Sequence, residues 1–423
     1  MSAVFFDFDK FYDKIKIKMK IINPSRIKKA DLIIGIPSHN ESKGIGFVVK
    51  EISNGLKKYF SGKKSVIVNV DNNSIDGTKE IFLKSSSDLT AKNISFIYCS
   101  TPKDIRGKGY NLRNLFKIIK NFKAVAGATF DADLKSITPL WVKKLISPVL
   151  SKRYDFVFPY YARLENDAVI TNHLVYPFVY GFLNLDIRQP IGGEFAFSGK
   201  LANDFLNLNW NKTDYQFGVD IFLGLSSYFL GAKICQVNLG KKIHKSSLPN
   251  LNCMFNQVTE SLLDVILRNK SKIKLTGKIQ NIPILRGGKL PQVSDIKPNF
   301  EIYEKMFFGG IKNHERDIDM LPSQIARRIS DMCVKRKMKI DGKLWSEIMY
   351  YLMAKPVLSG SSPKVSMDFL RCLFFGRVGT FFEETLNFAP SQTERAIRDE
   401  AEMVLKLFSA KRKTQSVKLK RKA

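Results

Sequence analysis

The sequence has little cysteine and no long apolar stretch. Its five cysteines lie far apart, with no C-x-x-C spacing and an odd total, which predicts neither a disulfide framework nor a zinc site. We expect all five to be small buried residues. No run reaches the roughly 18 apolar residues that a membrane span needs, and the first residues lack the layout of a signal peptide. These absences predict a soluble protein of the cytoplasm.

Acidic residues are also scarce, since 39 Asp and Glu stand against 69 Lys and Arg and the formal charge is +30. This charge favours anionic partners, which are nucleic acid, an acidic membrane surface or phosphorylated small molecules. A compositional bias toward lysine, isoleucine, asparagine and phenylalanine accounts for the charge equally well. Charge alone therefore selects none of the three partners.

The organisation of the chain changes along its 423 residues, which are too many for one ordinary core. Residues 1–30 predict a basic N-terminal extension, with strand-like alternation over 15–21. From residue 31, short apolar runs alternate with segments of helical spacing, which is typical of a mostly parallel, doubly wound α/β sheet. The runs are Leu32–Ile36, Val66–Val70, Ile94–Tyr98, Val125–Phe130, Phe156–Phe158 and Ile234–Leu239.

Beyond about residue 250 the alternation stops, so we predict an α/β domain over 31–250 and a helical region over 251–410. Three sets of apolar residues have helical spacing there: Phe255, Val258, Leu262 and Ile266; Leu344, Ile348 and Leu352; and Ile397, Ala401, Val404 and Phe408. Ser391-Gln-Thr-Glu394 after Pro390 has the spacing of a capping box, which predicts the start of the last helix. The basic residues 411–423 cannot bury a core and predict a disordered tail.

Carboxylates follow two of the predicted strands. Asp131-Ala132-Asp133 comes after Val125–Phe130, and two carboxylates in such a loop can hold Mg²⁺ or Mn²⁺ next to a diphosphate. A helix N-cap is the alternative. Asp71, Ser74 and Gly77 lie in the turn after the second run, where an acid and close backbone N–H groups can bind a nucleoside, although an ordinary strand-turn-helix junction is equally compatible with that segment.

Three further segments carry polar groups near strand ends. Pro37-Ser-His39-Asn40-Glu41 ends the first strand; its glutamate could contact a base or cap a helix, and His39 alone is more typical of a loop. Arg106-Gly-Lys108-Gly precedes a helix and suits a phosphate, with a plain basic turn as the alternative. His244 could be a metal ligand or a surface histidine in a lysine-rich turn. Because these segments follow successive strands of one sheet, we expect them to form one ligand site at the carboxyl ends of the strands.

Taken together, these residues resemble nucleotide-diphospho-sugar glycosyltransferases of the GT-A fold, in which D-x-x-S-x-D-G-T and D-x-D bind donor and metal. Four further motifs are similar to the retaining glucosylglycerate and glucosyl-3-phosphoglycerate synthases, with mannosylglycerate synthases as more distant relatives. They are Thr171-Asn172, Arg188-Gln-Pro-Ile-Gly192-Gly193-Glu194-Phe-Ala-Phe-Ser198, Phe217-Gly-Val-Asp220 and Cys235-Gln-Val-Asn-Leu-Gly240-Lys-Lys-Ile-His244. The resemblance covers about residues 31–270 and implies synthesis of a compatible solute.

The resemblance also implies a role for each matching residue. The nucleotide-sugar would be bound by Pro37, Asn40, Glu41, Asp71, Ser74, Gly77, Lys108, Asp131 and Ala132. A Mg²⁺ or Mn²⁺ ion would be held by Asp133 and His244, with Asp131 as a further candidate. The acceptor pocket would be lined by Arg163, Thr171, Asn172, Gly192 and Gly193, and Glu194 and Asp220 would lie near the reacting sugar.

The predicted function is a metal-dependent, retaining transfer of glucose or mannose to a small hydroxy acid, such as glycerate or 3-phosphoglycerate. The donor nucleotide stays open among UDP, GDP and ADP, and a homodimer is equally open. An enzyme at the membrane surface with a lipid or polyprenyl-phosphate acceptor is one alternative, because the N-terminal arm and tail are rich in lysine. A nucleic-acid-binding protein is another, but the sequence has no readable signature for it and we expect no specific nucleic-acid partner.

Overall fold

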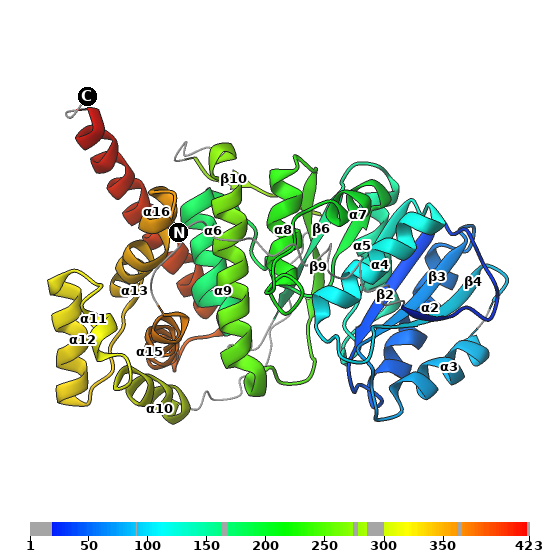
Figure 1. Ribbon diagram of the computed structural model, residues 1–423, viewed down its shortest axis with the longest axis horizontal. Coiled ribbons are helices and arrows are strands. Elements are labelled where there is room, and N and C mark those ends of the chain that lie inside the picture. The colour runs from blue at the N-terminus through cyan, green and yellow to red at the C-terminus, as the bar shows by residue number, and fades with distance from the viewer. Residues whose placement is uncertain are drawn as a thin grey trace. The chain divides into compact units, whose positions relative to one another are not determined.

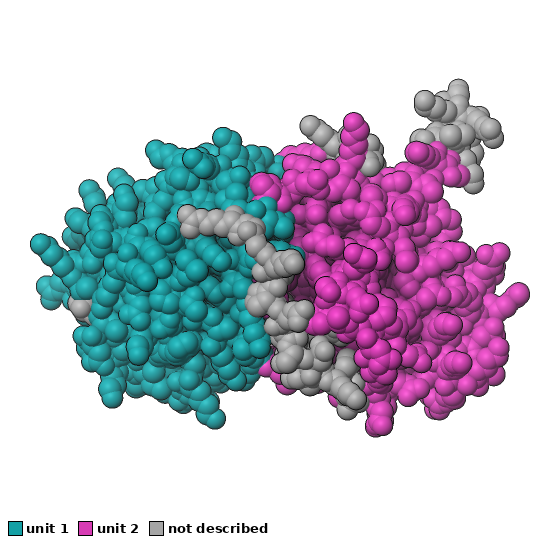
Figure 2. Space-filling view, turned by 180° about the vertical axis from the view of Figure 1, so that it is seen from behind, with its two compact units in different colours: residues 1–160, 192–245, 284–288 teal, residues 161–191, 246–283, 289–423 magenta. Residues whose placement is uncertain are grey.

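The computed structural model describes residues 19–89, 91–162, 168–273, 278–285, 300–361 and 366–420, with side chains described to residue 414. The chain divides into two compact units, which Figure 2 colours separately. Unit 1 comprises Met1–Tyr160, Gly192–Lys245 and Ile284–Gly288. Unit 2 comprises Tyr161–Ile191, Ser246–Pro283 and Lys289–Ala423. Residues 161–191, which fall inside the predicted 31–250 domain, therefore belong to unit 2.

A nine-stranded sheet forms the centre of unit 1 (Figure 1), in the order β1-β4-β3-β2-β5-β8-β6-β9-β11. Its strands are β1 Lys20–Ile22, β2 Leu32–Ser38, β3 Ser65–Asp71, β4 Ile94–Ser100, β5 Ala126–Thr129, β6 Phe156–Ala162, β8 Ala196–Ser198, β9 Ile234–Lys241 and β11 Ile284–Leu285. Strands β4, β3, β2 and β5 are parallel, whereas β8 is antiparallel to β5 and β6. All six predicted strands are present, and the predicted α/β class with a mostly parallel sheet is confirmed.

Helices follow the strands of unit 1 because the intervening segments have one apolar face. They are α2 Ile45–Tyr59, α3 Thr78–Leu89, α4 Lys108–Phe122, α5 Pro139–Leu150, α7 Gly199–Leu206 and α8 Val219–Phe229. A Cβ on Gly35 of β2 would lie 2.3 Å from Leu115 Cδ2, so this glycine lets α4 pack directly on the sheet. The first residue of α4 is thereby held at the carboxyl ends of the strands.

Unit 2 is mainly helical, as predicted for the region beyond residue 250. Its elements are η1 Thr171–Val175, α6 Tyr176–Leu183, η2 Leu248–Asn250, α9 Leu251–Arg268, η3 Lys270–Lys272, α10 Phe300–Ile311, α11 Glu315–Ile318, α12 Ser323–Lys335, α13 Gly342–Met349, η4 Tyr350–Ala354, α14 Lys355–Leu358, α15 Met367–Thr385, α16 Pro390–Lys420 and a small parallel pair of β7 Leu185–Asp186 with β10 Gln280–Asn281. The residues of all three predicted helical faces are buried.

The last helix differs from its prediction at both ends. Helix α16 begins at Pro390, where Gln392 accepts a hydrogen bond from the Ala389 N–H (2.7 Å), and Glu394 binds Arg188 instead of closing a capping box. The helix then continues to Lys420, so the prediction of disorder from residue 411 is wrong for residues 411–420. Arg412 explains part of this extension, because its Nη2 donates a hydrogen bond to the Phe182 carbonyl (2.7 Å) and so connects α16 to α6.

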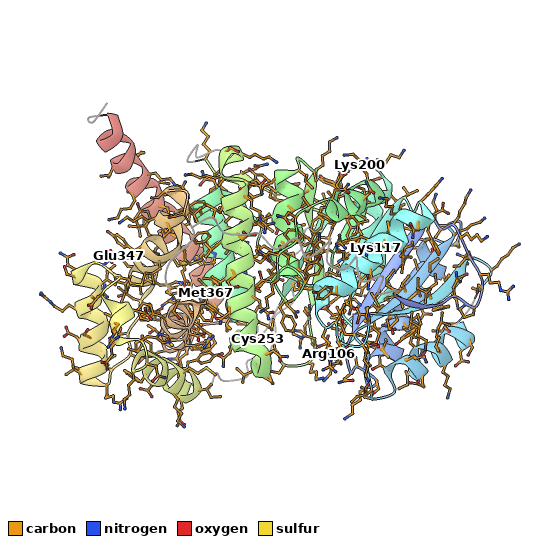
Figure 3. All side chains as sticks on the ribbon, in the orientation of Figure 1. Arg106, Lys117, Lys200, Cys253, Glu347 and Met367 are labelled. Carbon is orange, nitrogen blue, oxygen red and sulfur yellow. The ribbon has the colours of Figure 1, made fainter. Side chains whose placement is uncertain are left out.

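The remaining sequence predictions concern the burial of the cysteines, the N-terminal segment and the absence of a membrane span. Cys99, Cys235 and Cys372 are free and buried as expected, but Cys253 on α9 (Figure 3) is exposed and Cys333 is half-buried. Lys20–Ile22, at the end of the segment with strand-like alternation, forms an edge strand antiparallel to β4, while residues 15–18 lie outside the described part of the chain. Among the described residues, no helix has both the length and the apolar character that crossing a bilayer requires.

Candidate functional site

Parallel strands β2, β3 and β5 bring three of the predicted motifs to one edge of the sheet of unit 1. In their register Ser38 pairs with Asp71 and Gly35 pairs with Thr129, so the segments that follow leave the sheet side by side. These segments are 37–41, 71–78 and 131–133. The expected clustering at the carboxyl ends of the strands is therefore present.

Asp71 organises this edge from inside. Its buried carboxylate accepts hydrogen bonds from Ser38 Oγ (2.8 Å), Ser74 Oγ (2.5 Å), Ser74 N (2.8 Å) and Tyr98 OH (3.0 Å). Both oxygens are thus occupied by groups of the protein. Asp71 and Ser74 hold the 71–78 turn in place, which is a different task from the direct nucleoside contact that the sequence resemblance implies.

Hydrogen bonds also join the 37–42 loop to the 71–78 turn. The Asn40 N–H donates to Ser74 Oγ (2.8 Å), the Ile75 N–H donates to Asn40 Oδ1 (3.0 Å), and the Glu41 N–H donates to Thr78 Oγ1 (2.8 Å). Pro37 of β2 pairs with Val70 of β3, and Gly77 has a φ of +90° that favours glycine. The two loops form one rigid rim on which the Glu41 side chain is partly exposed.

Beside this rim, two lysines and three carboxylates form a continuous ionic cluster, which we name the strand-end cluster: Lys108, Asp131, Glu194, Asp220 and Lys242. Lys108 Nζ lies 3.0 Å from Asp131 Oδ1 and 3.2 Å from Asp220 Oδ2. Lys242 Nζ lies 2.8 Å from Glu194 Oε2 and 3.8 Å from Asp131 Oδ2. Asp131 is therefore placed between two ammonium groups, which makes it a poor metal ligand in this arrangement.

The pKa values of the two aspartates in the strand-end cluster shift in opposite directions. Burial would raise the pKa of Asp131, but the charges of Lys108 and Lys242 outweigh burial and hold that pKa below its ordinary value. Burial is the main reason that the pKa of Asp220 lies above its ordinary value, because Lys108 opposes the shift only in part and Asp131 adds to it. Asp220 Oδ1 is buried and has no hydrogen-bond partner in the described structure, so it is the oxygen best placed to receive a ligand hydroxyl.

The Gly192–Glu194 segment reaches the strand-end cluster because β8 pairs with β5. The register Ala128 with Ala196 continues through the hydrogen bond from the Thr129 N–H to the Phe195 carbonyl (2.8 Å). Gly193 has a φ of +92°, and a Cβ there would lie 2.5 Å from Asp131 Oδ2. Only glycine allows this close approach, so the segment is built around Asp131.

A second group of side chains lies on the rim: Glu41, Asp133, His244 and Lys245. His244 Nδ1 lies 3.8 Å from Asp133 Oδ2, and Lys245 Nζ lies 3.5 Å from Glu41 Oε1. Burial and the nearby charge of Asp133 raise the pKa of Glu41, while Lys245 opposes the shift. Asp133 and His244 thus face each other as the sequence predicts, while Ala132 between the two aspartates is buried.

These two facing side chains are a partial metal site. No set of three or more His, Cys, Asp or Glu side chains among the described residues could hold a metal ion by itself. Mg²⁺, however, is commonly bound by one or two carboxylates together with substrate phosphates and water. Asp133 and His244 fit such an ion, whereas Asp131, the further predicted ligand, is paired with Lys108 at 3.0 Å and lies 3.8 Å from Lys242.

The predicted phosphate turn and acceptor residues have other local partners. Arg106 lies in the loop before α4 (Figure 3) and is exposed, and Gly109 is needed because a Cβ there would lie 2.1 Å from the Asp214 carbonyl. Thr171 and Asn172 are buried in unit 2, where Asn172 Oδ1 accepts from Arg188 Nη1 (3.0 Å). Arg163 lies outside the described residues. The predicted roles of these acceptor residues stay predictions.

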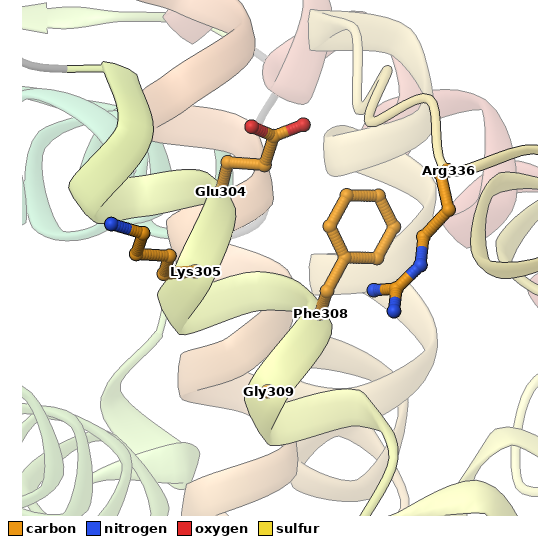
Figure 4. Close-up of a pocket in the computed structure, with 5 residues that line it drawn as sticks. All are labelled: Glu304, Lys305, Phe308, Gly309 and Arg336. Carbon is orange, nitrogen blue, oxygen red and sulfur yellow. The ribbon is translucent and has the colours of Figure 1, made fainter.

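Sequence reasoning missed Lys242, and one hollow in unit 2 lies away from every predicted motif. Lys242 sits in a run of lysines, so residue type alone gave no signal for its burial. The hollow, of about 350 Å³, is lined by Glu304, Lys305, Phe308, Gly309 and Arg336 (Figure 4). The Arg336 guanidinium lies 5.4 Å from the centre of the Phe308 ring, and none of the five lining residues is buried. We assign it no role.

Part of the chain matches a known family, and the fold is similar to solved structures. Residues 33–203 match the sequence profile described as Glycosyl transferase family 2. The chain is similar to solved structures of glucosyl-3-phosphoglycerate synthase from Mycobacterium tuberculosis. The complex with Mg²⁺ and UDP is 23% identical, with 59% of this chain and 82% of that chain covered and a TM-score of 0.43. The complex with Mn²⁺, UDP-glucose and phosphoglyceric acid is 24% identical, with the same coverage and TM-score. No curated protein sequence matches the chain.

Proposed function

We propose that this glycosyltransferase, whose residues 33–203 match the family 2 profile, is a retaining hexosyltransferase. It would move glucose or mannose from a nucleotide-diphospho-sugar to a small hydroxy acid such as glycerate or 3-phosphoglycerate. The observation that carries the proposal is the strand-end cluster, in which a buried, unpartnered carboxylate oxygen of Asp220 lies beside the Lys108 ammonium. Sugar transfer needs these two groups, one for phosphate charge and one for a hydroxyl.

Lys108 is the residue we assign to the donor phosphates. It is the first residue of α4, so its ammonium and the N-terminus of the helix both favour an anion. Burial would lower the pKa of Lys108, but the charges of Asp131, Asp220 and Glu194 outweigh burial and raise it, so the ammonium stays charged. A donor phosphate can therefore compete for a cation that is already in place.

Asp133 and His244 are the residues we assign to Mg²⁺ or Mn²⁺, with the donor diphosphate supplying further oxygens. A bound divalent ion there would neutralise charge on the diphosphate as the sugar leaves. His244 must be neutral to bind a metal, and Asp133 must be ionised. Glu41 lies next to this pair and would face the ribose or the base from the rim.

Asp220 is the residue we assign to the acceptor hydroxyl. In same-face transfer the bond between the sugar carbon and the phosphate oxygen breaks, the acceptor oxygen bonds to that carbon, and the acceptor proton passes to the departing diphosphate. The protein then needs no nucleophile, and its side chains act by orienting groups and stabilising charge. Asp220 Oδ1 can orient the hydroxyl by accepting its hydrogen bond.

A matrix of UDP-, GDP- and ADP-sugars against glycerate and 3-phosphoglycerate, with and without Mn²⁺ or Mg²⁺, tests this function. We expect turnover with one donor, dependence on the metal, and a product whose anomeric configuration by NMR equals that of the donor. An inverted product would rule out same-face transfer and would make Asp220 a general base. No turnover with any pair would reject the small-acid acceptor.

A lipid or polyprenyl-phosphate acceptor is the second candidate. It is favoured by the end of α12, where Val334 is 83% exposed and is followed by the exposed Lys335, Arg336 and Lys337. An apolar side chain among cations suits the surface of an anionic bilayer. Sedimentation with anionic and neutral vesicles at low salt separates the candidates, since failure to sediment with either vesicle would leave only a small acceptor.

A further inference from the structure

Lys242 is the most deeply buried cation of the strand-end cluster, with only 4% of its side chain exposed. Its Nζ donates to the Gly192 carbonyl (2.8 Å) and to both oxygens of Glu194 (3.1 and 2.8 Å). One ammonium therefore binds both ends of the Gly192–Glu194 segment. Burying a lysine is costly unless its charge is compensated, so this pair holds the segment in one conformation.

Glu194 does not reach outward from this pair. Its side chain is 0% exposed and both of its oxygens accept from Lys242, although the sequence resemblance places it near the reacting sugar. Gly193, between the two segment ends that Lys242 holds, packs directly against Asp131. Contacts then run from Lys242 to Asp131 (3.8 Å), from Asp131 to Lys108 (3.0 Å) and from Lys108 to Asp220 (3.2 Å).

We infer that Lys242 and Glu194 are a positioning pair for sugar transfer, an inference that rests on the proposed function. The pair fixes the Gly192–Glu194 segment against Asp131, and Asp131 in turn sets the positions of Lys108 and Asp220. Neither Lys242 nor Glu194 touches substrate. Glu194 is thus a positioning residue rather than a catalytic one.

Loss of the pair has a specific consequence for the rate. Without the Lys242 ammonium, the buried Glu194 carboxylate has lost its neighbouring cation and the Gly192–Glu194 segment can move away from Asp131. Lys108 and Asp220 then lose their fixed separation, and a displacement of about 1 Å in such groups can reduce turnover about 100-fold. Donor affinity should fall less than kcat, because only the Lys108 part of the donor site shifts, while hydrogen bonds between 37–41 and 71–78 still hold the rim.

The test uses the full chain with the donor and acceptor on which the wild type is active. We compare Lys242→Met, Glu194→Gln, the double variant and Lys242→Arg, with Lys241→Met as the matched control. Lys241 is the neighbouring residue of β9 and is half-buried. We expect Lys242→Met to lower kcat about 100-fold with the donor KM within about threefold. Glu194→Gln should lower kcat about tenfold, and the double variant should lose no more than Lys242→Met alone, because the pair acts as a unit.

Four outcomes decide the matter. Additive losses in the double variant, or a raised donor KM with kcat retained, would overturn the inference, and the second would make Lys242 a direct phosphate ligand. If Lys242→Met does not fold, Glu194→Gln is the test variant, and full activity of that variant would also overturn the inference. Lys242→Arg should recover part of the lost kcat, since it restores charge but not the ammonium geometry.

The inference and the proposed function fail in different ways. If the wild type is active and the variants are unaffected, only the inference fails. If the wild type transfers no sugar, the proposed function fails, and the same double-mutant cycle read on thermal unfolding without ligand still tests the pair. If the changes in unfolding temperature caused by the Lys242 and Glu194 substitutions are additive, the positioning pair is rejected.

Discussion

Both units contain buried networks of cations and carboxylates, and the two networks differ in the type of cation that they use. Unit 2 uses arginine: Arg377 binds Glu400 (2.9 Å) and Glu384 (2.9 Å), and Arg188 binds Glu394 (2.7 Å). Unit 1 uses lysine: Lys108 lies 3.0 Å from Asp131 and 3.2 Å from Asp220, and Lys242 lies 2.8 Å from Glu194.

The difference identifies which network has a chemical role. The guanidinium forks in unit 2 tie α15, α16 and the 188–191 turn together, and planar bidentate pairing suits fixed structure. The strand-end cluster has compact ammonium groups at the edge of a parallel sheet, where ligands of such folds bind. We expect substitutions in unit 1 to change rate more than stability, and substitutions in unit 2 to do the reverse.

Asp133→Ala should give the largest effect. We expect kcat/KM to fall about 1,000-fold, equivalent to about 4 kcal/mol of transition-state stabilisation, because the divalent ion loses its carboxylate. Stability should change by about 0.5 kcal/mol or less, since Asp133 is only half-buried. Steady-state kinetics and thermal unfolding measure the two effects. Asp204→Ala, which removes a half-buried carboxylate that lies 3.6 Å from the exposed Lys200 ammonium, is the control and should be silent.

Arg377→Met should give the next largest effect, and it should lower stability rather than the rate of turnover. Removing one partner of a buried pair costs about 3 kcal/mol, because Glu400 and Glu384 lose their counter-charge. Turnover per folded molecule should stay at the wild-type value. Arg371→Met on the same helix breaks a more exposed pair with Asp368 and should cost less than about 1 kcal/mol. Lost turnover with unchanged stability in Arg377→Met would erase the distinction between the two networks.

Gly193→Ala should affect both quantities. The φ of +92° strains a Cβ, which costs about 1 kcal/mol. Contact at 2.5 Å with Asp131 Oδ2 should in addition lower kcat about tenfold by displacing that carboxylate. Gly231→Ala is the matched control, because Gly231 has a φ of +76° with no atom within 4 Å and so shares the strain without the contact. Equal kcat in the two variants would show that Asp131 tolerates displacement.

Glu394→Gln should give the smallest effect, a change in the pH dependence of stability that is limited to acidic pH. Burial would raise the pKa of Glu394, but Arg188 outweighs burial and lowers it below the ordinary value of 4.5. A carboxylate whose pKa is lowered by folding stabilises the fold above the unfolded pKa, and this stabilisation is lost as the pH falls below about 4.5. The unfolding temperature of the variant should therefore fall less steeply than that of the wild type between about pH 5 and pH 3. Parallel curves for the two proteins would contradict this assignment.

The sheet and its strand-end motifs could be predicted because they depend on local patterns. Apolar runs and turn residues indicated six of the nine strands of the sheet. Parallel pairing then brought Asp71, Asp133 and Lys108 to one edge of unit 1. Asp133 and His244, the two predicted metal ligands, lie 3.8 Å apart. The GT-A class implied by the sequence is confirmed by the mostly parallel sheet together with the family 2 domain.

What could not be predicted depends on contacts between distant residues. Nothing in the sequence separates the buried Lys242 from the half-buried Lys241, because burial follows from β8 pairing with β5 and bringing Glu194 to the cluster. Asp131 and Asp133 are equivalent in a D-x-D motif, yet Lys108 and Lys242 lie beside the first, whereas His244 lies beside the second. The end of α16 resembled a disordered tail because the contact of Arg412 with Phe182 is invisible in composition.

Diffraction from crystals grown with Mn²⁺ and a nucleoside diphosphate tests the central claim most directly, since the anomalous signal locates manganese without reference to the protein. We expect one peak within about 2.3 Å of Asp133 and His244, bridged by diphosphate oxygens, with Asp131 still bound to Lys108. A nucleotide bound at the rim with manganese on Asp131, or manganese away from the 133–244 pair, would contradict the account.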